Sequence, residues 1–239
     1  MRNLRSFEIV EYVKQRKRCS LDELRKHFGV SSATIHRDAS ALVARGALMR
    51  LRGGLAALET PAAEEAGLAS GSWRDRMDAG RAAKARIAEK AARFLVEGDI
   101  LFLDSSTTVG TLADLLPKVQ VRALTIVTNS VSVIERFSSF PPHWVLIGLG
   151  GPYDARLHAF LGQETFRQLE RLTLTKAFVS AYGLDDHSAT TNHENQAVLL
   201  SRVLERTPRK FLLVDRSKFG RSGLYRLAAR GAFDEVVTD

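Results

Sequence analysis

Residues able to bind a phosphate-bearing small molecule occur in short polar stretches between residues 104 and 218. Residues 104–108, Asp-Ser-Ser-Thr-Thr, offer hydroxyl groups and backbone amides where a helix is predicted to begin, and helix N-termini favour anions. Lys218 adds a positive charge, and Asn129 could hold a sugar hydroxyl or a carboxylate. Glycines within residues 148–151 let the backbone approach a ligand closely. Each stretch alone could equally be an ordinary turn.

These polar stretches directly follow continuous apolar runs that are typical of buried strands. Helical patterns alternate with the runs, and this alternation predicts a mostly parallel sheet covered by helices on both faces. The loops after the strands of such a sheet meet at its carboxyl edge, where ligands bind. The sequence therefore predicts a ligand site at that edge. The predicted strands cover residues 100–103, 124–127, 144–147, 176–180 and 210–214.

A second set of candidate residues lies in residues 31–46, which read as a helix capped by Ser31 and ended by Gly46. The opposite face is small, polar or basic, which suits entry into a DNA major groove. An ordinary amphipathic helix with a solvated face is the alternative. The apolar stripe, expected to face inward, contains Ile35, Ala39, Leu42 and Val43. The outer stripe contains Ser32, Ala33, His36, Arg37 and Ser40.

The neighbouring segments favour the DNA-binding alternative. Ser20 and Glu23 form a capping box that opens a helix with Leu21, Leu24 and Phe28 inward, and Gly29 ends it just before the Ser31 cap. So tight a connection predicts a helix-turn-helix. Gly53-Gly54 between two short apolar-rich runs predicts a hairpin, with Arg50 and Arg52 on one face to grip phosphate. A first helix is predicted from Leu4, Phe7, Ile9, Val10 and Val13.

Charge divides the chain in the same way. Residues 1–58 hold 12 Lys and Arg against 5 Asp and Glu, and the remaining residues hold 23 against 22. A basic module joined to a neutral body indicates a polyanion partner at one end only. The single Cys19 excludes an internal disulfide framework and indicates a reducing cytosol. No apolar run approaches a membrane span, no signal peptide is expected, and no metal-ligand spacing is present.

Residues 21–58 resemble the DNA-binding module of the DeoR family of bacterial regulators. The matching positions are Val30-Ser31, Thr34-Ile35, Arg37-Asp38, Leu42, Gly46, Leu48, Arg50 and Gly53-Gly54. His36 stands where arginine is usual, and Ala39 where leucine is usual. Asp38 cannot favour phosphate, so we expect it to orient a neighbouring arginine. We assign Ser31, Ser32 and Thr34 to phosphate oxygens, His36 and Arg37 to base edges or phosphate, and Arg50 and Arg52 to the DNA backbone.

The second half of the chain resembles the sensor domain of the same family, which is similar in fold to ribose-5-phosphate isomerase and the coenzyme A transferases. The resemblance implies a phosphorylated sugar or related metabolite as effector, repression relieved by that ligand, and a further helix or strand beyond Asp239. Ser106 replaces the usual glycine, and Gly162 and residues 215–220 also match. The predicted effector-binding residues are Asp104, Ser105, Ser106, Thr107, Thr108, Thr128, Asn129, Gly150, Gly151, Glu194 and Lys218.

The sequence thus predicts a winged helix-turn-helix domain over residues 1–58, a linker over residues 59–79 and a Rossmann-like α/β sensor over residues 80–239. The predicted function is a cytoplasmic transcriptional regulator of sugar metabolism, with no cofactor and no catalytic residues. Its expected partners are a double-stranded DNA operator, the effector, and further copies in a dimer or tetramer, because one short helix reads too few base pairs.

Two other functions remain open at this stage. An isomerase-like enzyme with an appended DNA-binding module could use Asp104, Asp215, Glu194, His193 and Lys218 for acid–base chemistry. A structural nucleic-acid-binding protein would have no effector, and a filled sheet edge would favour it. The basic module counts against the isomerase, because such an enzyme has no use for a groove-binding helix.

Overall fold

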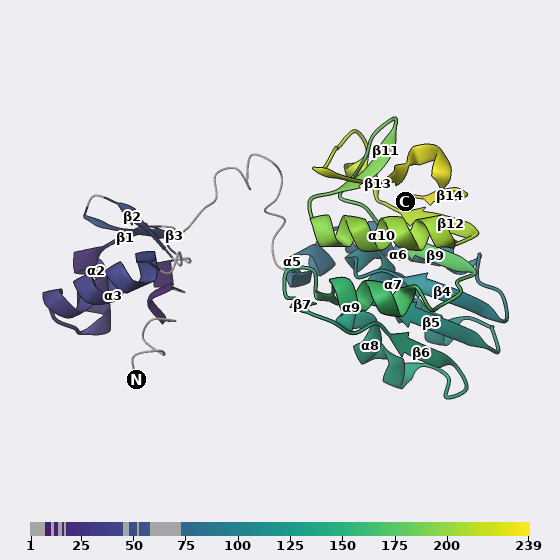
Figure 1. Ribbon diagram of the computed structural model, residues 1–239, viewed down its shortest axis with the longest axis horizontal. Coiled ribbons are helices and arrows are strands. Elements are labelled where there is room, and N and C mark those ends of the chain that lie inside the picture. Colours follow the sequence, from purple (N-terminus) through teal and green to yellow (C-terminus); the bar gives the residue numbers. More distant parts are fainter. Residues whose placement is uncertain are drawn as a thin grey trace. The chain divides into compact units, whose positions relative to one another are not determined.

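The computed structural model describes residues 8–10, 12, 13, 16, 18–44, 48–51, 53–57 and 73–239. The chain divides into two compact units, residues 1–69 and residues 70–239 (Figure 1). No helix among the described residues is long and apolar enough to cross a membrane.

The first unit contains the predicted helix-turn-helix. Residues 8–10, 12, 13 and 16 are helical, and they are followed by α2 (Leu21–Phe28) and α3 (Ser32–Ala44). The predicted capping box is present, with Glu23 N donating to Ser20 Oγ at 3.1 Å and Ser20 N donating to Glu23 Oε2 at 2.7 Å. Gly29 ends α2 in the left-handed region at φ 61°. The predicted contributions of Leu4, Phe7 and Gly46 lie outside the described residues.

The apolar stripes of the helices build one small core. Ile35, Ala39 and Leu42 of α3 are buried, as predicted, and Val43 is partly buried. Leu24 of α2 and Ile9 and Val13 of the first helical segment complete the packing with residues of the wing strands. The predicted apolar face of α3 is therefore confirmed as the face that packs inward.

The predicted hairpin pairs β2 (Leu48–Leu51) with β3 (Gly54–Ala57), and a third strand, β1 (Arg18–Ser20), joins β3 on its other side. The sequence did not predict β1, because three residues are too few for an alternating pattern to stand out. Only glycine fits at position 54, since a Cβ there would lie 2.4 Å from the Cys19 carbonyl oxygen. The wing therefore packs closely against the chain that precedes α2.

The second unit, described throughout residues 73–239, is built on one parallel six-stranded sheet. All five predicted strands are present, and each pairs in parallel with its neighbours. The order across the sheet is β14 (Glu235–Val237), β12 (Arg209–Leu213), β9 (Lys176–Val179), β4 (Asp99–Leu103), β5 (Leu124–Thr128) and β6 (Val145–Gly148).

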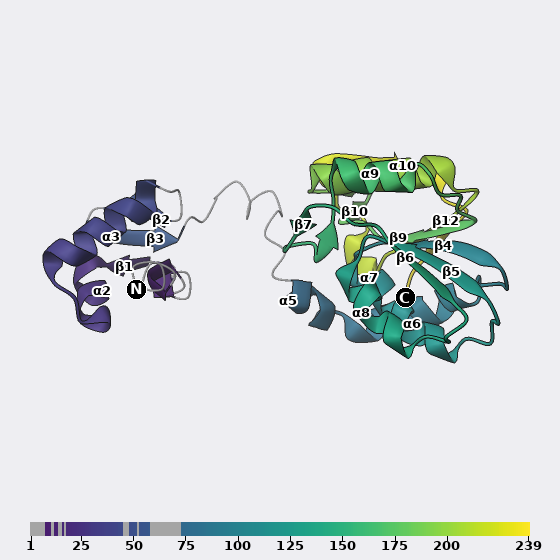
Figure 2. The ribbon, with the colours of Figure 1, turned by 60° about the horizontal axis from the view of Figure 1, so that its bottom comes forward.

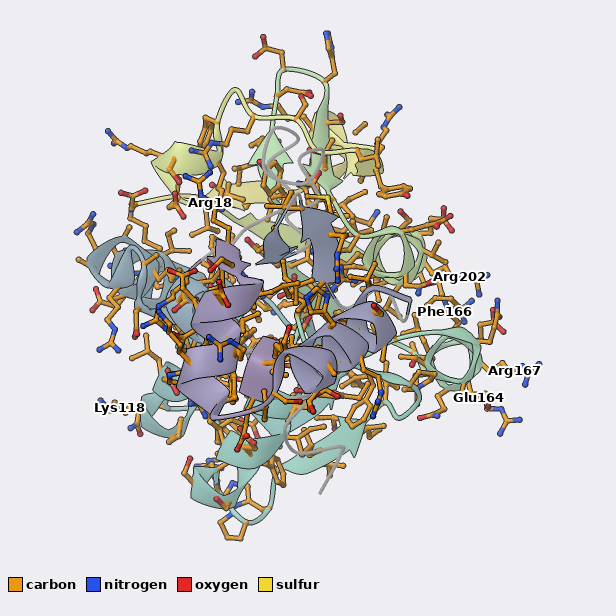
Figure 3. All side chains as sticks on the ribbon, turned by 90° about the vertical axis from the view of Figure 1, so that its left-hand side faces the viewer. Arg18, Lys118, Glu164, Phe166, Arg167 and Arg202 are labelled. Atoms are coloured by element: carbon orange, nitrogen blue, oxygen red, sulfur yellow. The ribbon has the colours of Figure 1, made fainter. Side chains whose placement is uncertain are left out.

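Helices cover both faces of this sheet, as predicted (Figure 2). Alternation along the strands explains the two cores: Phe102 points to one side and Leu101 and Leu103 to the other. One core packs α9 (Gln163–Leu169) and α10 (Glu194–Arg206), and Arg202 lies over the Phe166 ring, 5.0 Å from its centroid (Figure 3). The other core packs α6 (Arg81–Ala92), α7 (Thr107–Leu115) and α8 (Val131–Arg136).

Several smaller elements of this unit were not predicted. An antiparallel sheet orders β10 (Gly183–Leu184), β11 (Ser188–Thr191) and β13 (Tyr225–Ala229), and a short hairpin pairs β7 (Tyr153–Asp154) with β8 (Ala159–Phe160). The helix α5 (Trp73–Asp78) falls inside the range predicted as linker. The 3₁₀ turns are η1 (Leu116–Lys118), η2 (Phe137–Ser139), η3 (Arg216–Lys218) and η4 (Arg230–Ala232).

Candidate DNA-binding helix and effector site

The start of α3 is fixed by the predicted hydroxyl cap. Thr34 N donates to Ser31 Oγ at 3.3 Å, and the hydroxyls of Ser31 and Thr34 lie 2.8 Å apart. Both hydroxyls therefore hold the helix start, which presents the positive end of its dipole. Their predicted contact with a DNA phosphate requires a hydroxyl proton, and of these two hydroxyls the one that accepts the bond from the other keeps its proton for the phosphate.

The outer face of α3 is exposed along its length, which leaves it open to a partner. Ser32, Ala33, His36, Arg37 and Ser40 are all exposed. Asp38 is half-buried. The assignment of these residues to base edges and phosphates stays a prediction.

The wing carries exposed cations beside the helix-turn-helix. Arg50 of β2 is exposed, whereas Arg52 lies outside the described residues. Arg18 of β1 is also exposed on the same sheet (Figure 3). The sequence reading placed Arg18 at a helix end, so it missed this residue as a second cation of the wing sheet.

We expect Arg37→Ala to weaken operator binding by about tenfold, the effect of losing one good base or phosphate contact. Ser40→Ala, on the same exposed face, is the matched control and should change affinity little. A fluorescence-anisotropy titration of the operator at fixed salt measures both. Equal affinities for native protein and Arg37→Ala would remove Arg37 from the interface.

The turn between β4 and α7 is held from inside by Asp104. Asp104 Oδ1 accepts from Ser106 N at 2.8 Å, and Oδ2 accepts from Ser180 N, after β9, at 2.8 Å. The carboxyl group is buried, and burial raises its pKa to about 6, against the lowering effect of the bonds from Ser106 and Ser180. Asp104 thus joins two neighbouring strand ends and shapes the turn.

Ser106 caps α7, since its Oγ accepts from Val109 N at 3.2 Å. Ser105, Thr107 and Thr108 are buried around this helix start. Ser106 takes the place of the family's usual glycine with φ −70°, an ordinary value for a residue with a side chain. The predicted phosphate loop therefore forms a regular helix N-terminus.

Two further elements, α5 and α6, contact this helix start. The carbonyl oxygen of Arg76, on α5, accepts from Thr107 Oγ1 at 3.3 Å and also from Lys84 Nζ. Lys84, on α6, is buried and donates a second bond to Ala79 O at 2.6 Å. Burial lowers the pKa of the Lys84 ammonium, Asp215 raises it, and Lys218 lowers it. Lys84 thus lies within electrostatic range of the loop after β12.

Lys218 reaches the same region from η3, where its ammonium lies 5.9 Å from the Tyr182 ring centroid. Burial lowers its pKa, Asp215 raises it, and the charges of Arg221 and Arg76 lower it further. Lys218 is therefore within electrostatic range of Arg76, whose carbonyl oxygen accepts a bond from Thr107, and this indicates that Lys218 and residues 104–108 face the same region. A partly desolvated group of cations at a helix N-terminus favours an anionic ligand.

The other predicted residues fall into two groups. Thr128 is structural, since Oγ1 donates to Leu103 O at 2.6 Å and accepts from Ser130 N at 3.0 Å. Asn129 donates through Nδ2 to Phe160 O at 3.0 Å, but its buried Oδ1 has no hydrogen-bond partner among the described residues. Asn129 Oδ1 is thus an unpaired acceptor, whereas the Thr128 hydroxyl already donates one bond and accepts another.

The glycine turn after β6 packs against α9. Gly150 N donates to Gln168 Oε1 at 3.0 Å, and Thr165 Oγ1 donates to Gly150 O at 2.8 Å. Gly151 has φ 141°, and a Cβ there would lie 2.5 Å from Thr165 Oγ1, so only glycine fits. Glu194 is exposed at the first turn of α10. The structure gives no contact that ties Glu194 to the cationic group.

Sequence reasoning missed Arg76 and Lys84. Arg76 lay in the predicted linker, and Lys84 was not singled out within the predicted sensor domain. The one available signal was that Lys84 falls on the apolar side of its predicted helix. Lysine is rarely buried unless its ammonium is paired. Among the described residues, no three His, Cys, Asp or Glu side chains gather as a metal site.

Comparison with known proteins agrees with both halves of this description. Residues 5–61 match the DeoR-like helix-turn-helix domain, and residues 80–239 match the DeoR C terminal sensor domain. The chain is 31% identical over 239 residues to the HTH-type transcriptional regulator IolR of Bacillus subtilis, covering 100% of this chain and 91% of IolR. It is 29% identical to the glycerol-3-phosphate regulon repressor of Escherichia coli, covering 97% and 88%.

Among solved structures, ribose 5 phosphate isomerase A from Neisseria gonorrhoeae is 16% identical, with a TM-score of 0.40, and the match covers 61% of this chain and 54% of the isomerase. The named relatives are transcriptional regulators, so the regulator is favoured over the enzyme. The fold and the basic helix-turn-helix define a DNA-binding transcriptional regulator. The chain belongs to the DeoR family.

Proposed function

We propose that the protein represses genes of sugar metabolism and that a phosphorylated sugar, bound at the carboxyl edge of the six-stranded sheet, releases it from DNA. The observation that supports the effector most directly is the grouping of Arg76, Lys84 and Lys218 around the N-terminus of α7. Lys84 and Lys218 are partly or wholly removed from water, which is costly unless an anion completes the group.

The relatives supply a second line of support. The glycerol-3-phosphate regulon repressor, by its name, controls genes for a small phosphate ester. A dianionic phosphate fits a helix N-terminus flanked by cations, and the remainder of the ester would extend toward Asn129, whose Oδ1 still needs a partner. We assign the phosphate to Thr107, Lys84, Arg76 and Lys218, with Asp104 shaping the turn.

The proposed regulator acts as an oligomer in the cytoplasm. One α3 helix contacts too few base pairs for genomic specificity, so at least two copies are needed on one operator. Effector and operator sites are then coupled through the chain, by about 1–3 kcal/mol if the coupling is typical.

The experiment combines effector and operator. A thermal-shift screen of the full chain against phosphorylated sugars should identify a ligand that raises Tm by several degrees at about 100 times its Kd. Saturating that ligand should weaken binding to an operator selected from random duplexes by roughly 5- to 150-fold. Operator affinity should also fall with salt, with a log–log slope near −0.9 per phosphate neutralised. An operator affinity that no phosphorylated sugar changes would refute the proposed coupling.

A further inference from the structure

Two buried side-chain atoms of the sensor unit lack a hydrogen-bond partner among the described residues. They are Asn129 Oδ1 and His158 Nδ1. Buried polar atoms are nearly always paired, because an unpaired atom keeps the full cost of its desolvation. Each therefore requires a partner that the described part of the chain does not supply.

The two atoms come from neighbouring positions of one short antiparallel pairing. Phe160 N donates to Asn129 O at 2.9 Å, Val131 N donates to His158 O at 3.1 Å, and Ser130 forms a bridge with Ala159. Asn129 and His158 are thus diagonal neighbours across the pairing, a spacing that long or aromatic side chains can span. A ligand carrying two adjacent polar groups can reach both.

His158 is held in an unusual conformation. Its φ of 52° makes it the one non-glycine residue in the left-handed region among the described residues. Its ring lies against Trp73, with centroids 5.0 Å apart, and meets Tyr153 edge-on at 6.0 Å. Such strain is found where the surrounding structure fixes a side chain for a ligand.

Trp73 links this pair of atoms to the cationic group. Its Nε1 donates to Ser105 O at 3.3 Å, in the turn that begins α7. Arg76, one turn further along α5, donates through Nη2 to Arg156 O at 2.7 Å, in the loop between β7 and β8. The helix α5 therefore contacts both the β4–α7 turn and the β7–β8 hairpin that carries His158.

The helix α5 lies at the surface of this region. None of its residues is buried, and the bonds given above are polar. Elements with little buried apolar surface open at low free-energy cost. Because Trp73 covers His158, a small displacement of α5 would admit a ligand to atoms that solvent does not now reach.

We propose that Asn129 Oδ1 and His158 Nδ1 form a hydroxyl-binding subsite, covered by Trp73, that selects the polyol part of the effector. The inference rests on the proposed function, which supplies the phosphate end. A hydroxyl donates to Asn129 Oδ1 and pairs with His158 Nδ1 in either tautomer, since it both donates and accepts. The apolar face of Trp73 packs against the carbon chain. Two neighbouring hydroxyls on a phosphorylated sugar satisfy both atoms.

The test uses the full chain with Trp144→Phe. The sequence has two tryptophans, so this background leaves Trp73 as the sole tryptophan reporter. Ribose 5-phosphate, fructose 6-phosphate, glucose 6-phosphate, glycerol 3-phosphate and inorganic phosphate are titrated by tryptophan fluorescence and by calorimetry. His158→Phe keeps an aromatic ring against Trp73 and removes Nδ1. His143→Phe, at an exposed histidine, is the matched control.

We expect His158→Phe to weaken the best-bound sugar phosphate about tenfold or more while the Kd for inorganic phosphate changes less than about twofold. Asn129→Ala should show the same selective loss, which guards against a folding defect at the strained position 158. Urea unfolding and operator affinity without ligand verify that both variants fold. Binding of the sugar phosphate should change Trp73 emission, and inorganic phosphate should change it less.

Equal weakening of sugar phosphate and inorganic phosphate, or no weakening of either, would overturn the hydroxyl subsite and leave the proposed effector class standing. If the native protein binds inorganic phosphate but no sugar phosphate more tightly, the subsite is wrong and the anion site survives. If no compound in the panel binds, both the proposed phosphorylated-sugar effector and the hydroxyl subsite are refuted.

Discussion

Lys218→Met abolishes most of the response to a phosphorylated effector. A hydrogen bond to a charged group contributes about 1.5–3 kcal/mol, so the effector Kd rises roughly 10- to 150-fold. Methionine keeps the length of the side chain beside Tyr182 and removes only the ammonium. Operator affinity without effector stays unchanged, because Lys218 lies in the second unit. Calorimetry with the best-bound sugar phosphate gives the effector Kd.

Two controls separate charge from general damage. Lys118→Met alters an exposed lysine of η1 that extends outward from the unit (Figure 3), and it should leave the Kd unchanged. Lys218→Arg retains the charge and should restore part of the affinity. An effector Kd that is the same in Lys218→Met and native protein excludes Lys218 from the site.

The stability of the sensor unit falls as pH rises from about 4 to about 6, through Asp104. Burial raises the pKa of Asp104 from 3.8 to about 6 in the folded state, so the folded protein holds this proton more tightly than the unfolded chain. The stabilisation is therefore complete below the unfolded pKa and is lost as pH passes the folded one. The shift corresponds to about 3 kcal/mol. A hydrogen bond from Ser222 is the main reason that the pKa of Asp185 is lowered from 3.8 to about 2. The effect of Asp185 on stability therefore changes with pH only below about pH 4.

Urea unfolding of native protein and Asp104→Asn at several pH values measures this contribution. The free energy of unfolding of the native protein, minus that of the variant, should decrease by about 3 kcal/mol between pH 4 and pH 7. Asparagine cannot ionise, and it keeps one carbonyl acceptor for Ser106 N or Ser180 N. A difference that does not vary with pH would show that Asp104 ionises normally in the fold.

The sequence predicted those elements whose signals come from residues close together along the chain. The capping box at Ser20 and Glu23, the inward stripe of α3 and the five strand-then-turn stretches each depend on residues close together in sequence. The parallel order of the sheet followed from the alternation of strands and helices. The carboxyl-edge location of residues 104–108, Asn129 and Lys218 followed from that order alone.

The remaining features depend on contacts between distant segments. Arg76 joins the candidate site only because α5, too short at six residues for a helical period to show, lies between the β4–α7 turn and the β7–β8 hairpin. The left-handed backbone of His158 has no sequence signal, because only a small minority of non-glycine residues adopt it, even though histidine does so more often than most. Asp104 is predicted as an effector-binding residue, and nothing in the sequence indicates that its oxygens also accept bonds from Ser106 N and Ser180 N, which join two strand ends.

The position of α5 has a mechanical consequence. Its first residue directly follows residues 58–72, which connect to the unit that carries α3. Six helical residues span about 9 Å, and the same residues extended span about 20 Å. Unwinding α5 would thus add roughly 10 Å to the length of chain between residue 72 and α6. A ligand that holds α5 in its helical form, or lets it unwind, would therefore set that length.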